Sequence, residues 1–325
     1  MNNDPSITVL MAVHNGEKYL KEAVDSILQQ TFKDFEFLII NDASTDNTAK
    51  ILSEYRDGRI KIITNKQNIG LTKSLNKGLA EAKGEYIARM DADDISLPER
   101  LEIQKKFLNS NPEFACVGTS IIIINEVGHI INSKATVVNN ELLRFYLVLK
   151  NQVAHPSVIF KKEIVKQLGG YNESIKYAQD YDLWSRLLLS GQKISNIQKP
   201  LLKYRLHTKS ITQGDKKDTA YESAIKTTYM NMSKYIKINS LDFECFMRSY
   251  HKHEIDSAIN LYKINKIWNQ FKKSYLKVGQ PSTETKQIII SYINNEKINS
   301  LRWYTRIRCN IIYKLLTRTK RLLKK

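Results

Sequence analysis

The stretch IARMDADDISLPER gathers three carboxylates, Asp91, Asp93 and Asp94, directly after an apolar run. Carboxylates this close hold back one another's ionisation until a positive charge offsets their repulsion. One or two carboxylate ligands, completed by phosphate and water, are typical of Mg²⁺ or Mn²⁺ holding a nucleotide diphosphate. The alternative is a helix start, with Ser96 as cap and Pro98 in the first turn. That alternative leaves Asp91 and Asp93 unexplained, so we predict a metal site there. Asp94 fits either role.

Apolar runs alternate with helical patterns over the first hundred residues. Strands are expected over 7–13, 35–40, 60–64 and 85–90, and helices over 16–30, 44–55 and 71–82. Such alternation is typical of an α/β fold whose mainly parallel sheet is covered by helices on both faces. Because ligands bind at the carboxyl ends of such strands, the mostly polar segments at these ends are expected to meet at one edge. These are His14, Asn15, Asn41, Asp42, Asn65, Asp91, Ala92 and Asp93.

The pattern changes twice later in the chain. From 99 to 215 it is mixed, with helices expected over 99–109, 139–149 and 161–168, and strands over 114–124, 129–134, KISNI and LLKYRLH. Beyond 215 only helices are expected, over 219–238, 241–278 and 286–325. We therefore predict an α/β domain over 1–215, followed by a helical region over 216–325.

Net charge separates the same two regions. The chain of 325 residues carries +18, but 216–325 alone holds 23 Lys and Arg against 8 Asp and Glu. A near-neutral domain with a basic extension argues against a uniformly basic nucleic-acid binder. The three widely spaced cysteines, Cys116, Cys245 and Cys309, indicate neither a disulfide framework nor a zinc site. With no signal-peptide pattern and no long apolar run, we expect a cytoplasmic protein.

Five segments between Ile7 and Ser210 stand out. They read VLMAVHNGEKYLKEAVDSILQQTFKDFEFLIINDASTDNT, NIGLTKSLNKGLAEAKGEYIARMDADD, HPSVIF, GGYNESIKYAQDYDLWSRL and YRLHTKSIT. In this order they resemble the glycosyltransferase family 2 enzymes, which have the GT-A fold. The resemblance implies an inverting enzyme that takes a sugar from a UDP-sugar with the help of Mg²⁺ or Mn²⁺.

The resemblance also implies a donor site at the predicted strand ends. Asp42 matches the residue that reads the uracil edge, where a carboxylate can accept from an imide N–H. From residue type alone, an Asx turn before the next helix is as good an explanation. Asp91 would lie near the ribose and first phosphate, and Asp93 would bind the metal that bridges the phosphates. The other donor-site residues implied are Ala12, Val13, His14, Asn15, Glu17, Asn65, Lys73 and Ala92.

The segment AQDYDLWSRL carries a second group of acids. Asp180, Asp182 and Arg186 fall at helical spacing, which by itself fits ion pairs on a helix. In the family, the Asp of a Glu-Asp pair is the base that deprotonates the acceptor hydroxyl, and Asp180 corresponds to it. Gln179 replaces the usual Glu, which bears on acceptor binding more than on catalysis. Asp182 is the alternative base, and Trp184 either stacks on a sugar or belongs to the core.

The segment YRLHTKS resembles the part of the family fold that closes over the diphosphate. The resemblance implies a phosphate fork at Arg205 and a third metal ligand at His207, although a structural His is an equal alternative. His155, which precedes Pro156, is expected on the acceptor side with its role left open.

The last 25 residues, 301–325, contain nine Lys and Arg and no acid. Their apolar residues fall near one helical face, which predicts an interfacial helix on anionic lipid. A helix docked on the preceding domain with a solvated basic face is the alternative. Because many relatives extend a lipid-linked glycan, the resemblance implies such an acceptor and a peripheral position at the inner face of the cell membrane. No nucleic-acid partner is expected.

Together these observations predict a hexosyl- or N-acetylhexosaminyl-transferase of cell-surface polysaccharide synthesis. It would move the sugar from UDP to a hydroxyl of a glycan. Asp180 would deprotonate that hydroxyl, and a metal at Asp93 would assist the departure of UDP. Two alternatives are another enzyme, either a nucleotidyltransferase or a GDP- or dTDP-sugar transferase, and a non-catalytic nucleotide-sugar-binding protein at the membrane surface. The second is favoured only by Gln179. The sequence determines neither the sugar nor the acceptor.

Overall fold

The computed structural model describes residues 4–208, 210, 217–252, 255 and 257–322, with the backbone alone for 217, 252 and 306–322. The chain forms two compact units, Met1–Thr227 and Thr228–Lys325. The division falls inside one helix, α8 (Lys217–Met232), beyond the predicted boundary at 215. The basic composition therefore begins about a dozen residues before the boundary between the two packed units.

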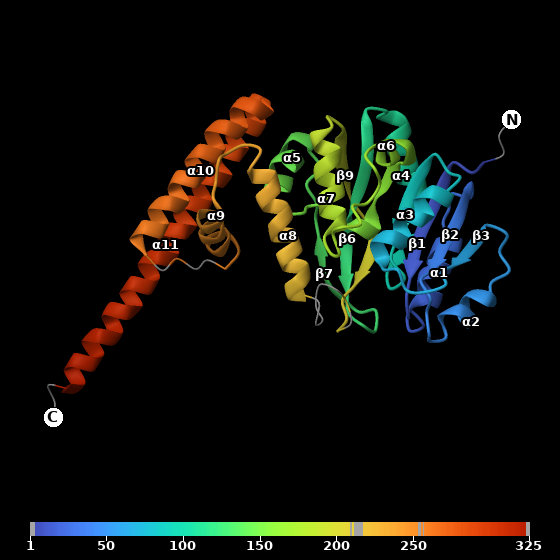
Figure 1. Cartoon of the computed structure of the whole chain (residues 1–325), viewed down its shortest axis with the longest axis horizontal. Coiled ribbons are helices and arrows are strands. Elements are labelled where there is room, and N and C mark those ends of the chain that lie inside the picture. The colour runs from blue at the N-terminus through green and yellow to red at the C-terminus, as the bar shows by residue number, and fades with distance from the viewer. Residues whose placement is uncertain (1–3, 209, 211–216, 253–254, 256, 323–325) are drawn as a thin grey trace. The chain divides into compact units, whose positions relative to one another are not determined.

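Four parallel strands form the first half of the sheet, in the order β3-β2-β1-β4 (Figure 1). They are β1 (Ile7–Val13), β2 (Phe35–Asn41), β3 (Ile60–Thr64) and β4 (Tyr86–Met90). Every residue of β1 and β4 is buried, as expected for parallel strands covered on both faces. Val13 pairs with Asn41, and Asn41 with Thr64, so the segments that follow these strands emerge at one edge.

Helices cover both faces of this sheet, which confirms the predicted α/β class. One face packs against α1 (Leu20–Leu28), α2 (Thr48–Ser53) and α4 (Arg100–Ser110). The other packs against α3 (Leu71–Glu81), α5 (Asn140–Leu149), α6 (Lys162–Gln167) and α7 (Gln179–Leu189). Side chains alternate along β1, with Val9 and Met11 in one core and Leu10 and Ala12 in the other.

The second half of the sheet is mixed and continues in the order β4-β8-β6-β9-β5, with β7 beside β6. Its strands are β5 (Ile95–Ser96), β6 (Phe114–Ile124), β7 (Ile130–Lys134), β8 (Ile159–Lys161) and β9 (Lys193–Arg205). The prediction of two short strands in place of β9 was wrong. Pro200 has no N–H to donate, and the register with β6 shifts beside its partner Ser120, yet pairing resumes on both sides.

The predicted helix start at Ser96 was also wrong. Ser96 lies in β5, where it pairs with Leu202 of β9, and α4 begins only at Arg100. The Ser96 hydroxyl accepts a hydrogen bond from Gln30 Nε2 (3.1 Å) instead of capping a helix. Strand pairing with a distant segment thus overrides the local capping pattern.

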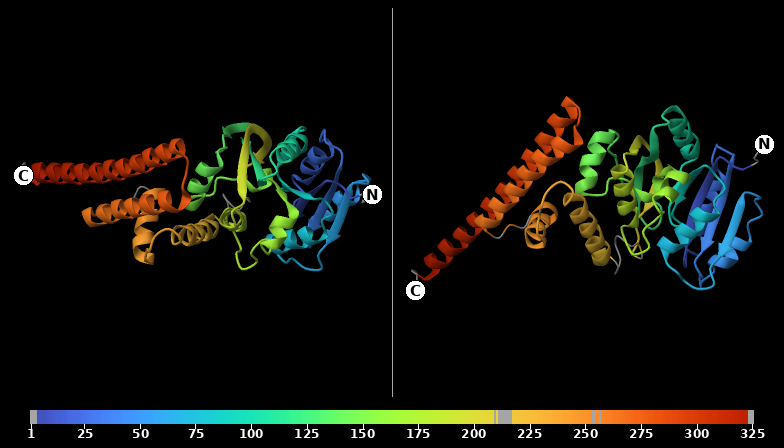
Figure 2. Two further views of the ribbon diagram at one scale, coloured as in Figure 1. Left: turned by 90° about the horizontal axis from the view of Figure 1, so that it is seen from above. Right: turned by 45° about the horizontal axis from the view of Figure 1, so that its top comes forward.

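The second unit is helical. After α8 come α9 (Ser240–Met247), the short π-helical turn Arg248–Lys252, α10 (Ala258–Gly279) and α11 (Thr283–Leu322). The helix predicted over 241–278 is therefore interrupted. Packing of α10 against α9 and α11 buries Phe246, Trp268 and Phe271, and α11 runs on past α10 (Figure 2).

None of the helices in the described part of the chain is long and apolar enough to cross a membrane. The backbone of α11 is helical through most of the basic stretch 301–325, as predicted. The side chains from 306 onward lie outside the described residues, so the predicted lipid-facing stripe stays a prediction.

Candidate active site

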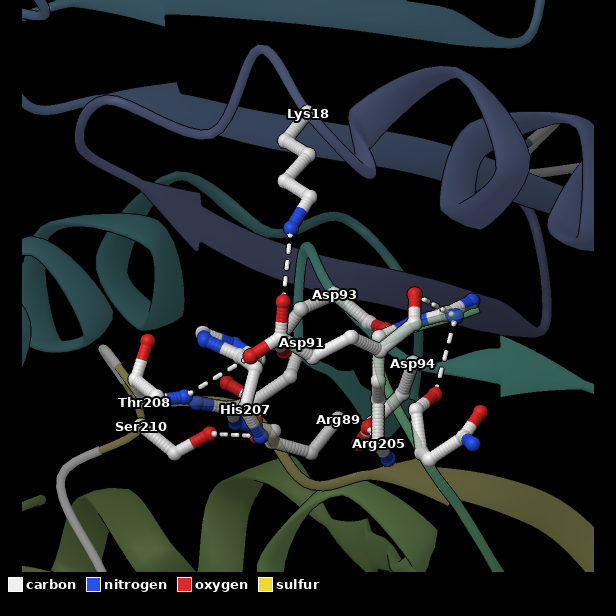
Figure 3. A network of polar contacts seen from close by, with 11 residues as sticks. Lys18, Arg89, Asp91, Asp93, Asp94, Arg205, His207, Thr208 and Ser210 are labelled. Carbon is white, nitrogen blue, oxygen red and sulfur yellow. Dashed lines mark hydrogen bonds and ion pairs between the residues drawn. The ribbon is translucent and has the colours of Figure 1, made fainter. Parts of the chain in front are cut away.

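The acidic cluster follows β4 at the edge of the sheet where the parallel strands end. Asp91, Asp93 and Asp94 each offer a carboxylate oxygen within 4.8 Å of the others. Asp93 Oδ2 lies 2.9 Å from Nε2 of His207, which follows β9 (Figure 3). The two predicted metal ligands therefore meet across the site, although they are far apart in sequence.

The Arg205 guanidinium binds groups of this cluster and its surroundings, so it is not free to form a bidentate contact with a phosphate. Its Nε donates to the carbonyl oxygen of Asp93 (2.8 Å), and its guanidinium also forms an ion pair with Glu22. Only 2% of the Arg205 side chain is exposed, so no edge of the fork faces outward. The predicted phosphate contact of Arg205 is thus contradicted, because the guanidinium is used up in holding the backbone of the acidic cluster.

Asp94 joins the acidic cluster to β9. Its Oδ1 accepts a hydrogen bond from the backbone N–H of Arg205 (2.8 Å), and its Oδ2 has no hydrogen-bond partner within the described residues. Burial raises the pKa of Asp94 well above its ordinary value, and the charges of Asp93 and Asp91 add to the rise. Asp94 starts no helix, so its structural task is to anchor the end of β9.

Asp42 organises the loop that follows β3. Its Oδ1 accepts from Asn65 Nδ2 (2.8 Å) and from the N–H of Ile69 (2.9 Å), and its Oδ2 accepts from the N–H of Gly70 (2.8 Å). These partners lie in another loop, so the Asx turn considered as an alternative is not what the carboxylate forms. The predicted donor residues Asp42 and Asn65 are in direct contact.

The loop after β1 is tied to the loop after β2. His14 Nδ1 lies 2.8 Å from the carbonyl oxygen of Asp42. Asn15 Oδ1 accepts from the N–H of Thr45 (2.8 Å), and Glu17 accepts from Asn47 Nδ2 (2.7 Å). The predicted donor residues Ala12, Val13, His14, Asn15 and Glu17 therefore gather at one edge with Asp42.

One predicted donor residue, Lys73, makes none of these contacts within the described part of the chain. Its side chain is exposed on α3, whereas Lys77, one turn later, donates to Asn65 Oδ1 (2.8 Å). Sequence reasoning missed Lys77. The available signal was its position four residues after Lys73, because residues at this spacing lie on the same face of a helix.

Asp180 is the second residue of α7, and the helix is preceded by Ala178, whose backbone is left-handed (φ +60°). Asn151 Nδ2 donates to Asp180 Oδ2 (2.8 Å). Burial raises the pKa of Asp180, while the hydrogen bonds and the nearby charge of Arg89 oppose the rise. A carboxylate oriented by hydrogen bonds, with its affinity for a proton increased, suits the role of a general base.

Asp182, the alternative base, is already committed to another task. Its Oδ2 pairs with Arg186 Nε (2.7 Å), and Arg186 donates further to the carbonyl oxygens of Leu168 and Gly170. The i,i+4 ion pair that the spacing predicted is therefore present. It is largely buried, and its arginine also binds the backbone of the loop after α6. This favours Asp180 over Asp182 as the base.

Trp184 and His155 are both buried in the first unit. Trp184 is fully buried, with its ring edge-on to His155 and Phe160, so the prediction that it stacks on a sugar was wrong and the core alternative holds. His155 Nε2 lies 2.8 Å from the hydroxyl of Tyr171. Burial lowers the pKa of His155 well below its ordinary value, so the imidazole is neutral.

The comparisons with known proteins agree with this geometry. Residues 8–169 match the model of glycosyl transferase family 2. The O-antigen biosynthesis glycosyltransferase WbnJ of Escherichia coli is 41% identical over 63% of this chain and 81% of its own. This chain belongs to glycosyltransferase family 2.

Two solved structures share the fold of this family 2 glycosyltransferase. S. aureus TarS 1–349 in complex with UDP-GlcNAc has a TM-score of 0.60 at 16% identity, covering 94% of this chain and 92% of its own. GalNAc-T7 with UDP, GalNAc and Mn²⁺ has a TM-score of 0.59 at 15% identity, covering 86% of this chain and 57% of its own. These likenesses establish the GT-A fold.

Sequence reasoning also missed Arg89 in this glycosyltransferase. The guanidinium forms an ion pair with Asp91 from inside β4 (Figure 3). The available signal was a cation inside an otherwise apolar buried strand, since unpaired charges are rarely buried.

Proposed function

We propose that this glycosyltransferase moves a hexosyl or N-acetylhexosaminyl group from a UDP-sugar to a glycan hydroxyl, with inversion at the anomeric carbon. The observation that carries the proposal is the meeting of Asp93 and His207 at 2.9 Å beside Asp91, on the sheet edge that also holds Asp42. The fold neighbours support a nucleotide-sugar donor, since TarS was solved with UDP-GlcNAc and GalNAc-T7 with UDP and GalNAc.

The donor set fits Mg²⁺ or Mn²⁺. Carboxylate oxygens of the acidic cluster lie within 4.8 Å of one another, and the oxygens and one imidazole nitrogen are ligands that these ions accept. Asp93 and His207 would hold the ion, with Asp91 beside the ribose and first phosphate. When bound, the metal supplies positive charge against the negative charge that develops on the departing UDP.

Asp180 is the catalytic residue on the acceptor side. It takes the proton of the acceptor hydroxyl as that oxygen bonds to the anomeric carbon, while the bond from the anomeric carbon to the UDP oxygen breaks. Asn151 orients the Asp180 carboxylate through its 2.8 Å hydrogen bond. A single displacement of this kind inverts the configuration and needs no covalent intermediate on the enzyme.

The proposal extends to a lipid-linked glycan acceptor at the inner face of the cell membrane. Its support is the basic helical unit, in which α10 exposes Ile259 and Tyr262 on the same side as Lys266, Lys273 and Lys277. Apolar side chains flanked by lysines suit the headgroup region of an anionic bilayer. WbnJ, by its name, acts in O-antigen biosynthesis, which accords with cell-surface polysaccharide assembly.

Nucleotide release from a panel of nucleotide sugars tests the proposal. With Mn²⁺, we expect slow release of UDP from at least one UDP-sugar, and its loss in EDTA or in Asp93→Asn. Release from a GDP- or dTDP-sugar alone would favour a different donor. If no UDP-sugar is hydrolysed and UDP shows no metal-dependent binding, the proposal fails.

A further inference from the structure

Of the three Lys and Arg side chains labelled in Figure 3, Lys18 is the one that a bound molecule can reach. The exposed fraction of the side chain is 1% for Arg89 and 2% for Arg205, against 64% for Lys18. Both arginines also bind protein groups, since Arg89 pairs with Asp91 and Arg205 donates to the backbone of Asp93. The network therefore combines buried cations that hold it together with an exposed cation at Lys18.

Lys18 lies in the loop between β1 and α1, where Glu126 holds it near the acidic cluster. Its Nζ lies 2.9 Å from Glu126 Oε2, and Glu126 Oε1 accepts a hydrogen bond from the N–H of Thr208 (3.3 Å). Thr208 directly follows His207, whose Nε2 lies 2.9 Å from Asp93 Oδ2. One carboxylate therefore joins Lys18 to the segment that carries a predicted metal ligand.

The ring of Tyr19 provides a second and independent link between the same two residues. Lys18 Nζ lies 4.9 Å from the centre of that ring, and the centre of the His207 imidazole lies 5.1 Å from it. Contacts through two different residues, Glu126 and Tyr19, therefore set the Lys18 ammonium near His207.

The ion pair of Lys18 with Glu126 can be exchanged for another anion at little cost. The Glu126 side chain is 39% exposed and that of Lys18 64%, and pairs this exposed contribute little to stability because water screens them. Hydrogen bonds from Lys18 and from the Thr208 N–H lower the pKa of Glu126, so its carboxylate is ionised at neutral pH. Glu126 can thus keep the lysine in the site without binding it tightly.

We propose that Lys18 binds the phosphates of the nucleotide-sugar donor, and that Glu126 keeps its ammonium in the site when the donor is absent. The inference rests on the proposed function, because it takes a nucleoside diphosphate as the bound group. A lysine ammonium is a compact charge with three N–H donors, which suits contact with phosphate oxygens. Lys18 then supplies, from the loop after β1, the phosphate contact that Arg205 does not make.

Calorimetric titration of the full chain with UDP and with uridine, both in the presence of Mn²⁺, tests the inference. In Lys18→Gln we expect the Kd of UDP to rise about tenfold, because a charge-assisted bond to phosphate is lost. The Kd of uridine, which has no phosphate, should stay unchanged. Lys18→Arg keeps the charge and should bind UDP within about threefold of the parent chain.

Glu126→Gln separates the ammonium from its ion pair. The amide oxygen of the new side chain can still accept from the Thr208 N–H, but no negative charge remains to compete for Lys18. We expect this variant to bind UDP at least as tightly as the parent chain does. A loss of UDP affinity as large as that of Lys18→Gln would show that the ion pair itself supports the site, and would overturn the inference.

Lys21→Gln is the matched control. Lys21 lies in α1, its side chain is 76% exposed, and it forms an ion pair of its own with Asp25 (2.6 Å). Its replacement removes the same charge from the same part of the chain and should leave the Kd of UDP unchanged. An equal loss of UDP affinity in Lys21→Gln and Lys18→Gln would mean that net charge is responsible, which overturns the inference.

The remaining outcomes also decide between the hypotheses. If Lys18→Gln binds UDP as the parent chain does, or loses affinity for uridine and UDP alike, the inference is wrong and the proposed function is unaffected. If Lys18→Gln weakens binding of Mn²⁺ alone, measured by electron paramagnetic resonance without nucleotide, Lys18 acts on the metal ligands and the inference is again wrong. If the parent chain binds no UDP with Mn²⁺, the proposed function and the inference fail together.

Discussion

The two units of the chain handle charge in opposite ways. The first unit buries charged residues at its site, with whole-residue exposures of 1% for Arg89 and Asp94, 0% for Arg100 and 3% for Arg205. The buried side chains of the second unit, within its described residues, are apolar, aromatic or neutral polar ones such as Trp268 and Phe271. Its lysines on α10 remain at the surface.

This difference suits the two units to different tasks, with catalysis in the first unit and binding to a charged surface in the second. A buried charge loses its water and is poorly screened by salt, so its effects depend on geometry and on pH. Charges on the surface of a helix attract an opposite surface over a distance and are screened by salt. We therefore expect substitutions in the first unit to alter sugar transfer and those on α10 to alter membrane binding.

The largest effect is expected from Asp180→Asn. General-base catalysis contributes about 10²- to 10⁴-fold to a rate, so kcat for transfer should fall by about that factor. Binding of UDP with Mn²⁺ should be unchanged, as measured by calorimetry on the same preparation. The control is Asp182→Asn, which breaks the pair with Arg186 and should mainly lower the melting temperature. Retained transfer in Asp180→Asn with a loss in Asp182→Asn would move the base to Asp182.

A smaller but still large effect is expected from Asp93→Asn. Removing one charged ligand should weaken metal-dependent UDP binding by about ten- to a hundredfold, because a neutral amide is a poorer ligand for a hard cation. His207→Ala should weaken it less, since the imidazole is a single neutral ligand across the site. Titrations of Mn²⁺ in the presence of UDP measure both. Full metal-dependent binding in Asp93→Asn would contradict the assignment of this ligand.

On the second unit, the triple substitution Lys266→Gln, Lys273→Gln and Lys277→Gln should reduce binding to vesicles of phosphatidylglycerol and phosphatidylcholine by about tenfold or more. Each basic residue near an anionic surface contributes about 1 kcal/mol, and added salt should remove the difference. Cosedimentation measures the bound fraction, with pure phosphatidylcholine vesicles as reference.

Three exposed lysines of the first unit, Lys50, Lys83 and Lys106, provide the matched control for that triple substitution. Their replacement by Gln should leave vesicle binding unchanged, while UDP release should persist in both triple variants. Equal losses of vesicle binding in the two would show that net charge alone, and not α10, directs association.

The smallest effect concerns pH. Burial raises the pKa of Asp180 above its ordinary value of 3.8, and the base acts only when ionised. Transfer should therefore be flat near neutral pH and fall on acidification, with the midpoint of kcat/KM above 3.8. Vesicle binding, which depends on lysines, should not follow this curve. A midpoint at or below 3.8 would remove the evidence for a buried base.

Much of the fold could be predicted because its signals are local. Apolar runs and helical spacing located β1 to β4 and the helices between them, and parallel pairing then brought the residues after those strands to one edge. This is why Asp42 and Asn65 were predicted near one another, and they are in contact. The break between α9 and α10 was missed, because packing of Phe246 against Trp268 decides it.

By itself, the sequence determined which carboxylates end which strands and that the basic residues collect in the helical region, since both follow from residue order. Tertiary structure decided what each polar side chain does. Arg205 became a brace, Trp184 a core residue and Ser96 part of a strand because segments distant in sequence met there. Packing of helices on both faces of the sheet also buried Arg89 within β4, where it pairs with Asp91.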